Sequence, residues 1–125
     1  MKPQLFLTVS LALVIQACTS VEDVRNSAPV ESAVVQGDYY DLAVCITQAQ
    51  TNSIRSAQLI DDRSNRRATI TARMEDGWSR PPLYELSLDQ TENGVRVELR
   101  SPKTLVDDRT PAARGVWREL QNCTA

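Results

Sequence analysis

The sequence contains no histidine and only 4 glycines among its 125 residues. Without histidine, the chain lacks the side chain that proteins use most often for proton transfer near neutral pH and for binding zinc. It also lacks a GxSxG nucleophile elbow, an HExxH metal motif and a glycine-rich phosphate loop. These absences disfavour the common hydrolase, metalloenzyme and nucleotide-binding classes.

Paired carboxylates are present, at Asp61-Asp62, Glu75-Asp76 and Asp107-Asp108. Each pair falls in an expected loop, where adjacent acidic residues are usually solvated parts of turns. A glycosidase needs two carboxylates about 5 to 10 Å apart across a cleft, and a chain this short has little room for one. We therefore expect that the protein is not an enzyme and holds no metal or other cofactor.

Charge also narrows the choice of partner. The chain has 14 basic and 16 acidic residues, a formal net charge of −2. A weakly acidic balance gives no electrostatic reason to expect nucleic acid as a partner.

The first 17 residues have the pattern of an export signal. A single basic residue, Lys2, precedes a mostly apolar run at 5–17, which is shorter than the roughly 20 residues that a membrane-spanning helix needs. The segment Ile15-Gln16-Ala17-Cys18 resembles the lipobox of bacterial lipoproteins. This resemblance implies cleavage before Cys18 and lipidation of that cysteine, and Thr19 after it favours the outer membrane, on its periplasmic side. The alternative is an ordinary secretory signal that leaves Cys18 as an unpaired thiol.

The two other cysteines, Cys45 and Cys123, are left as a pair once Cys18 is assigned to lipid. Export places the chain in an oxidising compartment, where such a pair normally forms a disulfide. Metal binding by the two thiolates is a weaker interpretation, because the chain has no histidine and neither cysteine has another nearby. A disulfide closing a loop of this length stabilises a fold by roughly 4 to 4.7 kcal/mol in the chain-entropy treatment.

The mature chain is long enough for one domain. Residues 18–36 mix polar residues with Pro29 and show no sustained period, so we expect a lipidated cysteine followed by a flexible tether. An alternative is that Val30, Val34 and Val35 dock as a short edge strand. Residues 37–125 form the expected single domain.

Two helices are expected at the ends of this domain. Asp38 is a good N-cap residue for the first, and Thr110-Pro111 is a strong start for the second. Apolar residues recur at helical spacing in each. They are Leu42, Cys45, Ile46 and Ala49 in the first helix, and Ala113, Val116, Trp117, Leu120 and Cys123 in the second. Both cysteines are therefore predicted on buried faces.

Between the helices, the apolar period changes to two, which predicts strands with one buried face. The alternating apolar residues are Ala57 and Leu59; Ala68, Ile70, Ala72 and Met74; Tyr84, Leu86 and Leu88; and Val95, Val97 and Leu99. Polar segments at 61–66 and 91–94 make two consecutive hairpins. The predicted fold is α+β: helix, four-stranded antiparallel sheet and helix in a two-layer sandwich, with a disulfide between the helices.

Charge fixes the register of the second hairpin. A four-residue loop at 91–94 places Asp89 opposite Arg96, whereas a two-residue turn at Asn93-Gly94 would place Asp89 opposite Glu98. Opposite charges across a strand pair are stabilising and like charges are destabilising. We therefore predict the first register, which also pairs Glu85 with Arg100.

Two function classes remain. The first is a small lipid-anchored envelope lipoprotein that serves as a protein-interaction or scaffold module, bound to the membrane through Cys18 and to another envelope protein through Trp78 and Arg80. The alternative is a periplasmic lipoprotein that binds a small ligand or inhibits a hydrolase. It would use the arginines of the turn at Arg63, Arg66 and Arg67, because guanidinium groups suit anionic partners.

Overall fold

The computed structural model describes residues 20–125 apart from 55, 76–79, 105–106 and 108. Within these ranges the chain forms three α-helices, one short 3₁₀ helix and five strands. In chain order they are α1 (Val21–Arg25), β1 (Glu31–Val35), α2 (Tyr39–Thr51), β2 (Gln58–Asp62), η1 (Arg63–Asn65), β3 (Arg67–Arg73), β4 (Pro82–Thr91), β5 (Gly94–Arg100) and α3 (Pro111–Thr124).

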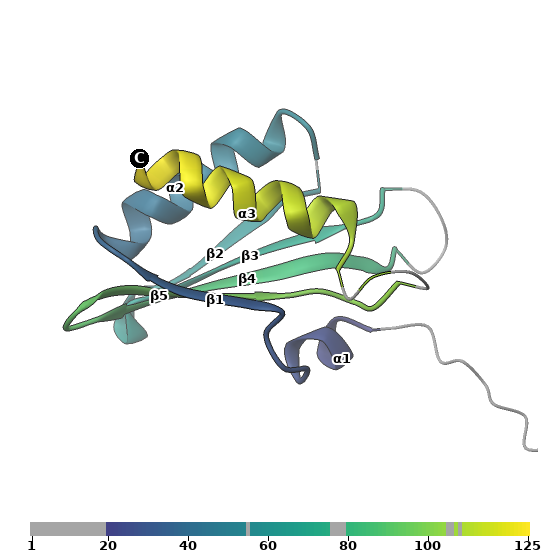
Figure 1. Ribbon diagram of the computed structural model, residues 1–125, viewed down its shortest axis with the longest axis horizontal. Coiled ribbons are helices and arrows are strands. Elements are labelled where there is room, and N and C mark those ends of the chain that lie inside the picture. The colour runs from purple at the N-terminus through teal and green to yellow at the C-terminus, as the bar shows by residue number, and fades with distance from the viewer. Residues whose placement is uncertain (1–19, 55, 76–79, 105–106, 108) are drawn as a thin grey trace, which may run out of the picture.

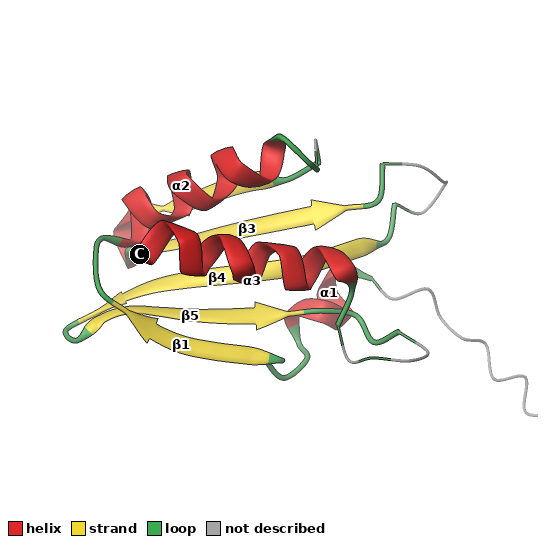
Figure 2. Ribbon diagram, turned by 45° about the horizontal axis from the view of Figure 1, so that its top comes forward, coloured by secondary structure: helices red, strands yellow, loops and turns green. Residues whose placement is uncertain are grey.

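The strands form one antiparallel sheet in the order β1-β5-β4-β3-β2. Helices α2 and α3 cover one face of it, here called the inner face, and α1 lies against the opposite, outer face (Figures 1 and 2). The two long helices pack against buried strand residues such as Ile70 and Val97. Their contributions to this core include Ile46, Val116 and Leu120. The predicted α+β class is confirmed, but the count of four strands is wrong because a fifth, β1, joins the sheet.

Strand β1 lies inside segment 18–36, where we expected a flexible tether. It pairs with β5, placing Ala33 opposite Val97. As an edge strand it has a neighbour on only one side, and its inward residues are just half-buried. Such a strand gives weak periodicity in the sequence, and the chain adopts the edge-strand alternative.

Helix α1 also belongs to the folded part of that segment. Its N-cap Ser20 accepts a hydrogen bond from the backbone of Asp23, whose carboxylate accepts one from the Ser20 N–H in return. This reciprocal capping stabilises a helix of only five residues. Val24 is 2% exposed, so the helix is held against the outer face rather than free in solvent.

The two predicted helix starts are confirmed. Asp38 accepts hydrogen bonds from the backbone N–H groups of Tyr40 and Asp41, and Thr110 accepts one from Ala113. Each cap satisfies donors that a helix leaves unpaired at its first turn. Pro111 occupies the first position of α3, where its missing N–H is no loss.

The predicted disulfide between Cys45 and Cys123 is present, with a Cα–Cα distance of 6.1 Å. It joins α2 to α3, which lie next to one another on the inner face (Figure 2). The expected burial of Cys45 is wrong: this residue is exposed, and α2 instead buries Leu42, Ala43 and Ile46. Cys45 points sideways toward the neighbouring helix, because α2 is rotated slightly from the predicted phase.

The predicted register of the second hairpin is confirmed, with Asp89 opposite Arg96 and Glu85 opposite Arg100. The turn itself is shorter than expected, because Thr91 and Gly94 still form a pair and only two residues lie between them. Gly94 has φ +136°, and a Cβ at this position would collide with the backbone carbonyl oxygen of Val35. Glycine therefore serves both the turn and the close approach of β1.

In the first hairpin, Ala68, Ile70 and Ala72 are fully buried on the inner face as predicted. Met74 is 46% exposed, although the alternation placed it with them. The reason is that β3 ends at Arg73, after an irregularity in its pairing with β4, so the period of two does not extend to Met74.

Candidate interaction surface

Polar side chains gather at the two ends of the sheet. We call the end with the β2–β3 turn, the β4–β5 turn and the start of α2 the distal end. The proximal end has the start of β2, the end of β3 and the start of β4, near α1 (Figure 1). The ten residues of β4 run between these ends and span roughly 33 Å.

The distal end carries a cluster of two tyrosines, one aspartate and one arginine. The Tyr39 hydroxyl donates a hydrogen bond of 3.0 Å to one Asp61 carboxylate oxygen, and the Arg63 Nε donates one of 3.0 Å to the other. The Arg63 guanidinium also lies 5.6 Å from the centre of the Tyr40 ring, within the range of a cation–π contact. Asp61 thus holds Arg63 in place beside an exposed aromatic ring.

These contacts affect the titration of the cluster. Burial, followed by the hydrogen bond to Asp61, raises the pKa of the Tyr39 hydroxyl. The hydrogen bond from Arg63 to Asp61 likewise raises the pKa of the Arg63 guanidinium. Both groups therefore keep their protons at neutral pH, and the Tyr39–Asp61–Arg63 bonding is complete there.

The two remaining arginines of the turn, Arg66 and Arg67, differ in whether they have an ion-pair partner. Arg67 makes two hydrogen bonds to the carboxylate of Asp89, at 2.5 and 3.2 Å, and this pairing raises its pKa. Arg66 adopts a left-handed conformation with φ 50°, and its side chain has no ion-pair partner among the described residues. Asp62 accepts hydrogen bonds from Ser64 and Asn65, which fixes the turn.

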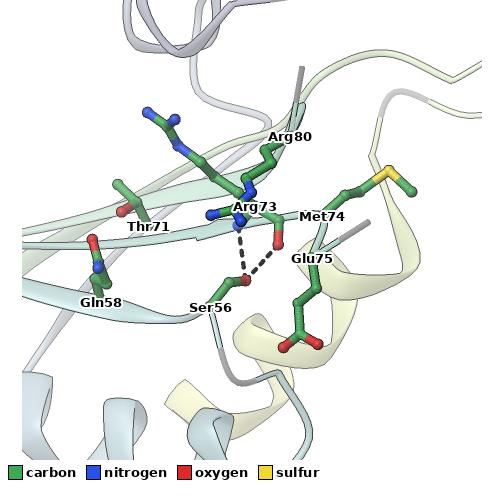
Figure 3. Close-up of a pocket in the computed structure, with 7 residues that line it drawn as sticks. All are labelled: Ser56, Gln58, Thr71, Arg73, Met74, Glu75 and Arg80. Atoms are coloured by element: carbon green, nitrogen blue, oxygen red, sulfur yellow. Dashed lines mark hydrogen bonds between the residues drawn. The ribbon is translucent and has the colours of Figure 1, made fainter. Parts of the chain in front are cut away.

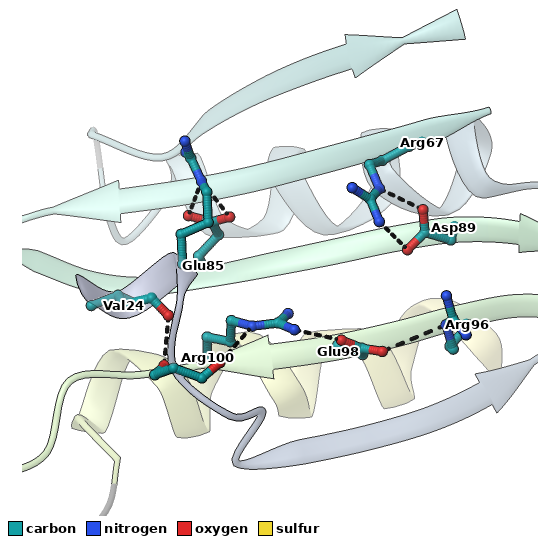
Figure 4. Close-up of polar contacts among 9 residues, drawn as sticks. Val24, Arg67, Glu85, Asp89, Arg96, Glu98 and Arg100 are labelled. Carbon is teal, nitrogen blue, oxygen red and sulfur yellow. Dashed lines mark hydrogen bonds and ion pairs between the residues drawn. The ribbon is translucent and has the colours of Figure 1, made fainter. Parts of the chain in front are cut away.

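The outer face between the two ends carries an array of ion pairs (Figure 4). Glu98 bonds to both Arg96 and Arg100, while Glu85 accepts hydrogen bonds from Arg25 of α1 at 3.2 and 3.3 Å. The outer face is therefore a surface of mixed charge. The residues assigned to it are Thr69, Thr71, Arg73, Glu85, Ser87, Asp89, Arg96, Glu98 and Arg100. However, α1 lies on part of it, and the Glu85 side chain is only 8% exposed.

At the proximal end there is an open concavity of about 420 Å³ (Figure 3). Its lining comes from the segment before β2, from β2 and β3, and from the ends of the 76–79 gap. The lining residues are Ser56, Gln58, Thr71, Arg73, Met74, Glu75 and Arg80. Ser56 fixes one wall, because its hydroxyl donates to the Arg73 carbonyl and accepts from the Arg73 N–H. Within the part of the chain that the structure describes, the guanidinium groups of Arg73 and Arg80 have no ion-pair partner.

The sequence-predicted surface residues do not form a single patch. Arg63, Arg66 and Arg67 lie at the distal end, while Arg80 lines the proximal concavity. Trp78 lies outside the described residues. Arg80 is exposed, and the hypothesis that joins Trp78 and Arg80 in one contact surface stays a prediction.

Sequence reasoning missed several residues that shape these surfaces. The ring of Tyr40 carries the contact with Arg63, although packing is the ordinary interpretation of a tyrosine at a helix start. The Arg25–Glu85 pair joins residues 60 positions apart, and no local pattern predicts such a contact. Arg73 could have been noticed as the last polar residue of the alternation, but nothing in the sequence marks it as unpaired.

The described residues contain no group of three or more potential ligands arranged to hold a metal ion. The buried side-chain polar atoms in the same part of the chain all have hydrogen-bond partners; for example, the Tyr84 hydroxyl donates to Gln50 at 3.0 Å. Burial raises the pKa of that hydroxyl, so it stays protonated. Among the described helices, none has the length and apolar character required to cross a bilayer.

Comparison with known proteins gives no relative to set beside this geometry: neither the family models nor the curated proteins nor the solved structures searched contain a match. The functional interpretation must therefore come from the two ends of the sheet and from the lipobox-like segment that precedes the fold.

Proposed function

We propose that this protein is a lipid-anchored module of a bacterial envelope, attached to the outer membrane through Cys18 and binding another envelope protein through its distal end. The observation that carries the proposal is the Tyr40–Arg63 pair, which is exposed yet held in a defined geometry. The Tyr40 residue is 37% exposed and the Arg63 side chain is 81% exposed.

Tyrosine and arginine are among the residues that contribute most often to the energetic centre of protein interfaces. Here both are pre-positioned, because Asp61 binds Arg63 and the Tyr39 hydroxyl at once. A side chain already held in its bound conformation loses less conformational entropy on association. The distal cluster is therefore better suited to a protein contact than a freely rotating surface arginine would be.

The position of the cluster supports the same role. Residues 20–25 lie at the proximal end, where Arg25 binds Glu85, and the lipobox-like segment precedes them directly. A chain anchored there presents its opposite end away from the lipid surface. The distal turn with Arg63 and Arg66 is then the part of the domain most accessible to a partner in the periplasm.

Crosslinking in intact cells tests the contact. The double variant Tyr40→Ala/Arg63→Ala should lose the crosslinked partner that the wild type retains, because it removes the ring and the guanidinium together. The matched control is Arg118→Ala, which removes an exposed arginine from α3 and should leave the partner unchanged. An identical set of crosslinked proteins for the double variant and the wild type would disprove the distal assignment.

The alternative, a ligand-binding or hydrolase-inhibiting lipoprotein, loses support at the arginine turn. Arg63 and Arg67 are already paired with Asp61 and Asp89, so an anionic ligand would have to displace an internal carboxylate. A thermal-shift panel of cell-wall fragments and anionic small molecules tests it. Stabilisation by one of them that Arg63→Ala abolishes would revive this alternative against the protein contact.

A further inference from the structure

The proximal concavity has more positive charge in its lining than the described residues neutralise. Arg73 and Arg80 both line it without an ion-pair partner among those residues, and Glu75 is the only acidic residue of the lining. In Figure 3 the carboxylate of Glu75 points away from both arginines. A counter-charge beyond those of the described residues would complete this site.

The other lining groups are suited to an anion. The Thr71 hydroxyl can donate a hydrogen bond, and it makes no side-chain hydrogen bond elsewhere in the described structure. Guanidinium forks bind phosphate oxygens with matched geometry. Two such forks together with a hydroxyl make a polar recess with the composition of a phosphate site.

The concavity lies next to the helix that leads to the proposed anchor. Thr71 pairs across the sheet with Glu85, and Glu85 is the residue that Arg25 of α1 binds. Neighbouring strands are about 4.8 Å apart, so α1 is docked one strand away from the lining of the concavity.

The chain between this docking point and Cys18 is short. The five residues of α1 span roughly 7.5 Å at 1.5 Å per residue. From Ser20 back to Cys18 is two residues, which reach at most about 7 Å. The acyl chains on Cys18 would therefore enter the membrane within roughly 15 Å of the Arg25 backbone, taking both lengths together.

From this arrangement we infer that the proximal concavity, through Arg73 and Arg80, binds the phosphate of a phospholipid headgroup in the membrane that holds Cys18. The inference rests on the proposed lipid anchor and adds a second, polar contact with the same membrane. It also sets the orientation of the domain: the proximal part of the outer face lies against the headgroups, and the distal end points away from them.

The test uses the full lipidated protein, reconstituted in vesicles of anionic phospholipid whose headgroups carry a quencher. A small fluorescent amino acid replaces Gln58 in one sample and Arg118 in another, so that the concavity and the wet side of α3 are compared in the same chain. We expect stronger quenching at position 58 than at position 118. Equal quenching at the two positions would overturn the inference.

The variant Arg73→Gln/Arg80→Gln removes both charges and keeps hydrogen-bonding side chains of similar reach. Each arginine near an anionic membrane surface contributes a factor of about five, so the ratio of docked to undocked domain should fall roughly 25-fold. Quenching at position 58 should then approach that at position 118. The control Arg118→Gln, measured with the probe at position 58, should change nothing. If the double variant remains fully quenched, these arginines do not bind the headgroups.

Two further arms separate the possible sources of phosphate. In vesicles of a phosphate-free glycolipid, the difference between positions 58 and 118 should disappear, and its persistence would overturn the headgroup assignment. Inorganic phosphate added to phospholipid vesicles should leave quenching at position 58 in place. If inorganic phosphate releases the domain, the site prefers free phosphate and its assignment to a lipid headgroup is wrong.

Failure of the anchor would look different. A protein that leaves the vesicles in an alkaline wash has no lipid anchor, and both proposals then fall together. A protein that stays with the vesicles but shows no excess quenching at position 58 keeps its anchor and loses only the headgroup site.

Discussion

Two arginines at the distal end of the sheet and two at the proximal end differ in whether a carboxylate pairs with them. At the distal end, Arg63 and Arg67 are bound to Asp61 and Asp89. At the proximal end, Arg73 and Arg80 line a concavity without an ion-pair partner in the described part of the chain. A paired arginine is fixed and offers a surface of defined shape, whereas an unpaired one gains most from an incoming anion. This difference is why we propose a protein contact at one end and a phosphate contact at the other.

The largest expected effect is the loss of membrane attachment in the variant Cys18→Ser. This variant tests whether the proximal end faces a membrane. The variant cannot accept a thioether-linked lipid, so it should lose its resistance to extraction from membranes, as measured by fractionation with an alkaline wash. The Cys45–Cys123 bond should persist in non-reducing electrophoresis, because the two cysteines are joined within the domain. A variant that still resists extraction would show that Cys18 does not anchor the protein. The proposed difference between a membrane-facing proximal end and a partner-facing distal end would then lose its basis.

The next largest effect concerns the rigidity of the distal end. The disulfide joins α2 to the last turn of α3 over a sequence separation of 78 residues. The double variant Cys45→Ser/Cys123→Ser should lower the free energy of unfolding by about 4 kcal/mol, as measured by urea denaturation. Hydrogen exchange should rise more in the first half of α2, which supports Tyr39 and Tyr40, than in the proximal strands. A loss below about 1 kcal/mol would mean that packing alone holds the two helices.

A smaller effect is expected from Arg25→Ala, which removes the polar contact between α1 and the outer face. Glu85 is then left as a carboxylate with 8% side-chain exposure and without its hydrogen-bond donor from α1. Leaving such a group unsatisfied costs about 1 to 3 kcal/mol, which urea denaturation can resolve. The control Arg118→Ala changes a solvated arginine and should stay within about 0.5 kcal/mol of the wild type. Equal effects of the two variants would show that α1 is not held through Glu85.

The parts of the fold that could be predicted from sequence are those in which both partners of a contact leave a local pattern. The register of the second hairpin followed from charges at Asp89 and Arg96, because opposite charges directly across a strand pair are stabilising and like charges are destabilising. The disulfide followed from a count of cysteines and from the compartment that the export signal implies. Each of these two predictions, the register and the disulfide, was supported by more than one residue of the sequence.

The rest depended on contacts that no local pattern records. Cys45 lies on the flank of α2 rather than on its buried face, since helix rotation is set by packing against α3 as well as the sheet. Strand β1 has a single neighbour and so a weak alternation. Of the candidate surface, the arginines could be named from the sequence, but whether each was paired depended on carboxylates that only the fold brings near. For Arg67 that carboxylate is Asp89, 22 residues away.

The smallest expected effect is on the pH dependence of stability. One carboxylate from each end of the sheet can be compared. Hydrogen bonds from the Ser20 backbone and hydroxyl lower the pKa of Asp23 in α1, and hydrogen bonds from Asn65 and Ser64 lower that of Asp62 in the distal turn. Because both folded-state pKa values lie below the ordinary 3.8, each contribution to stability is complete above that pH and is lost as pH falls through the folded value. Carboxyl NMR titration should therefore give both midpoints below 3.8. A normal midpoint for Asp23 with a lowered one for Asp62 would mean that the α1 cap is open in solution, and the proximal end would then lose the docking that directs it toward the membrane.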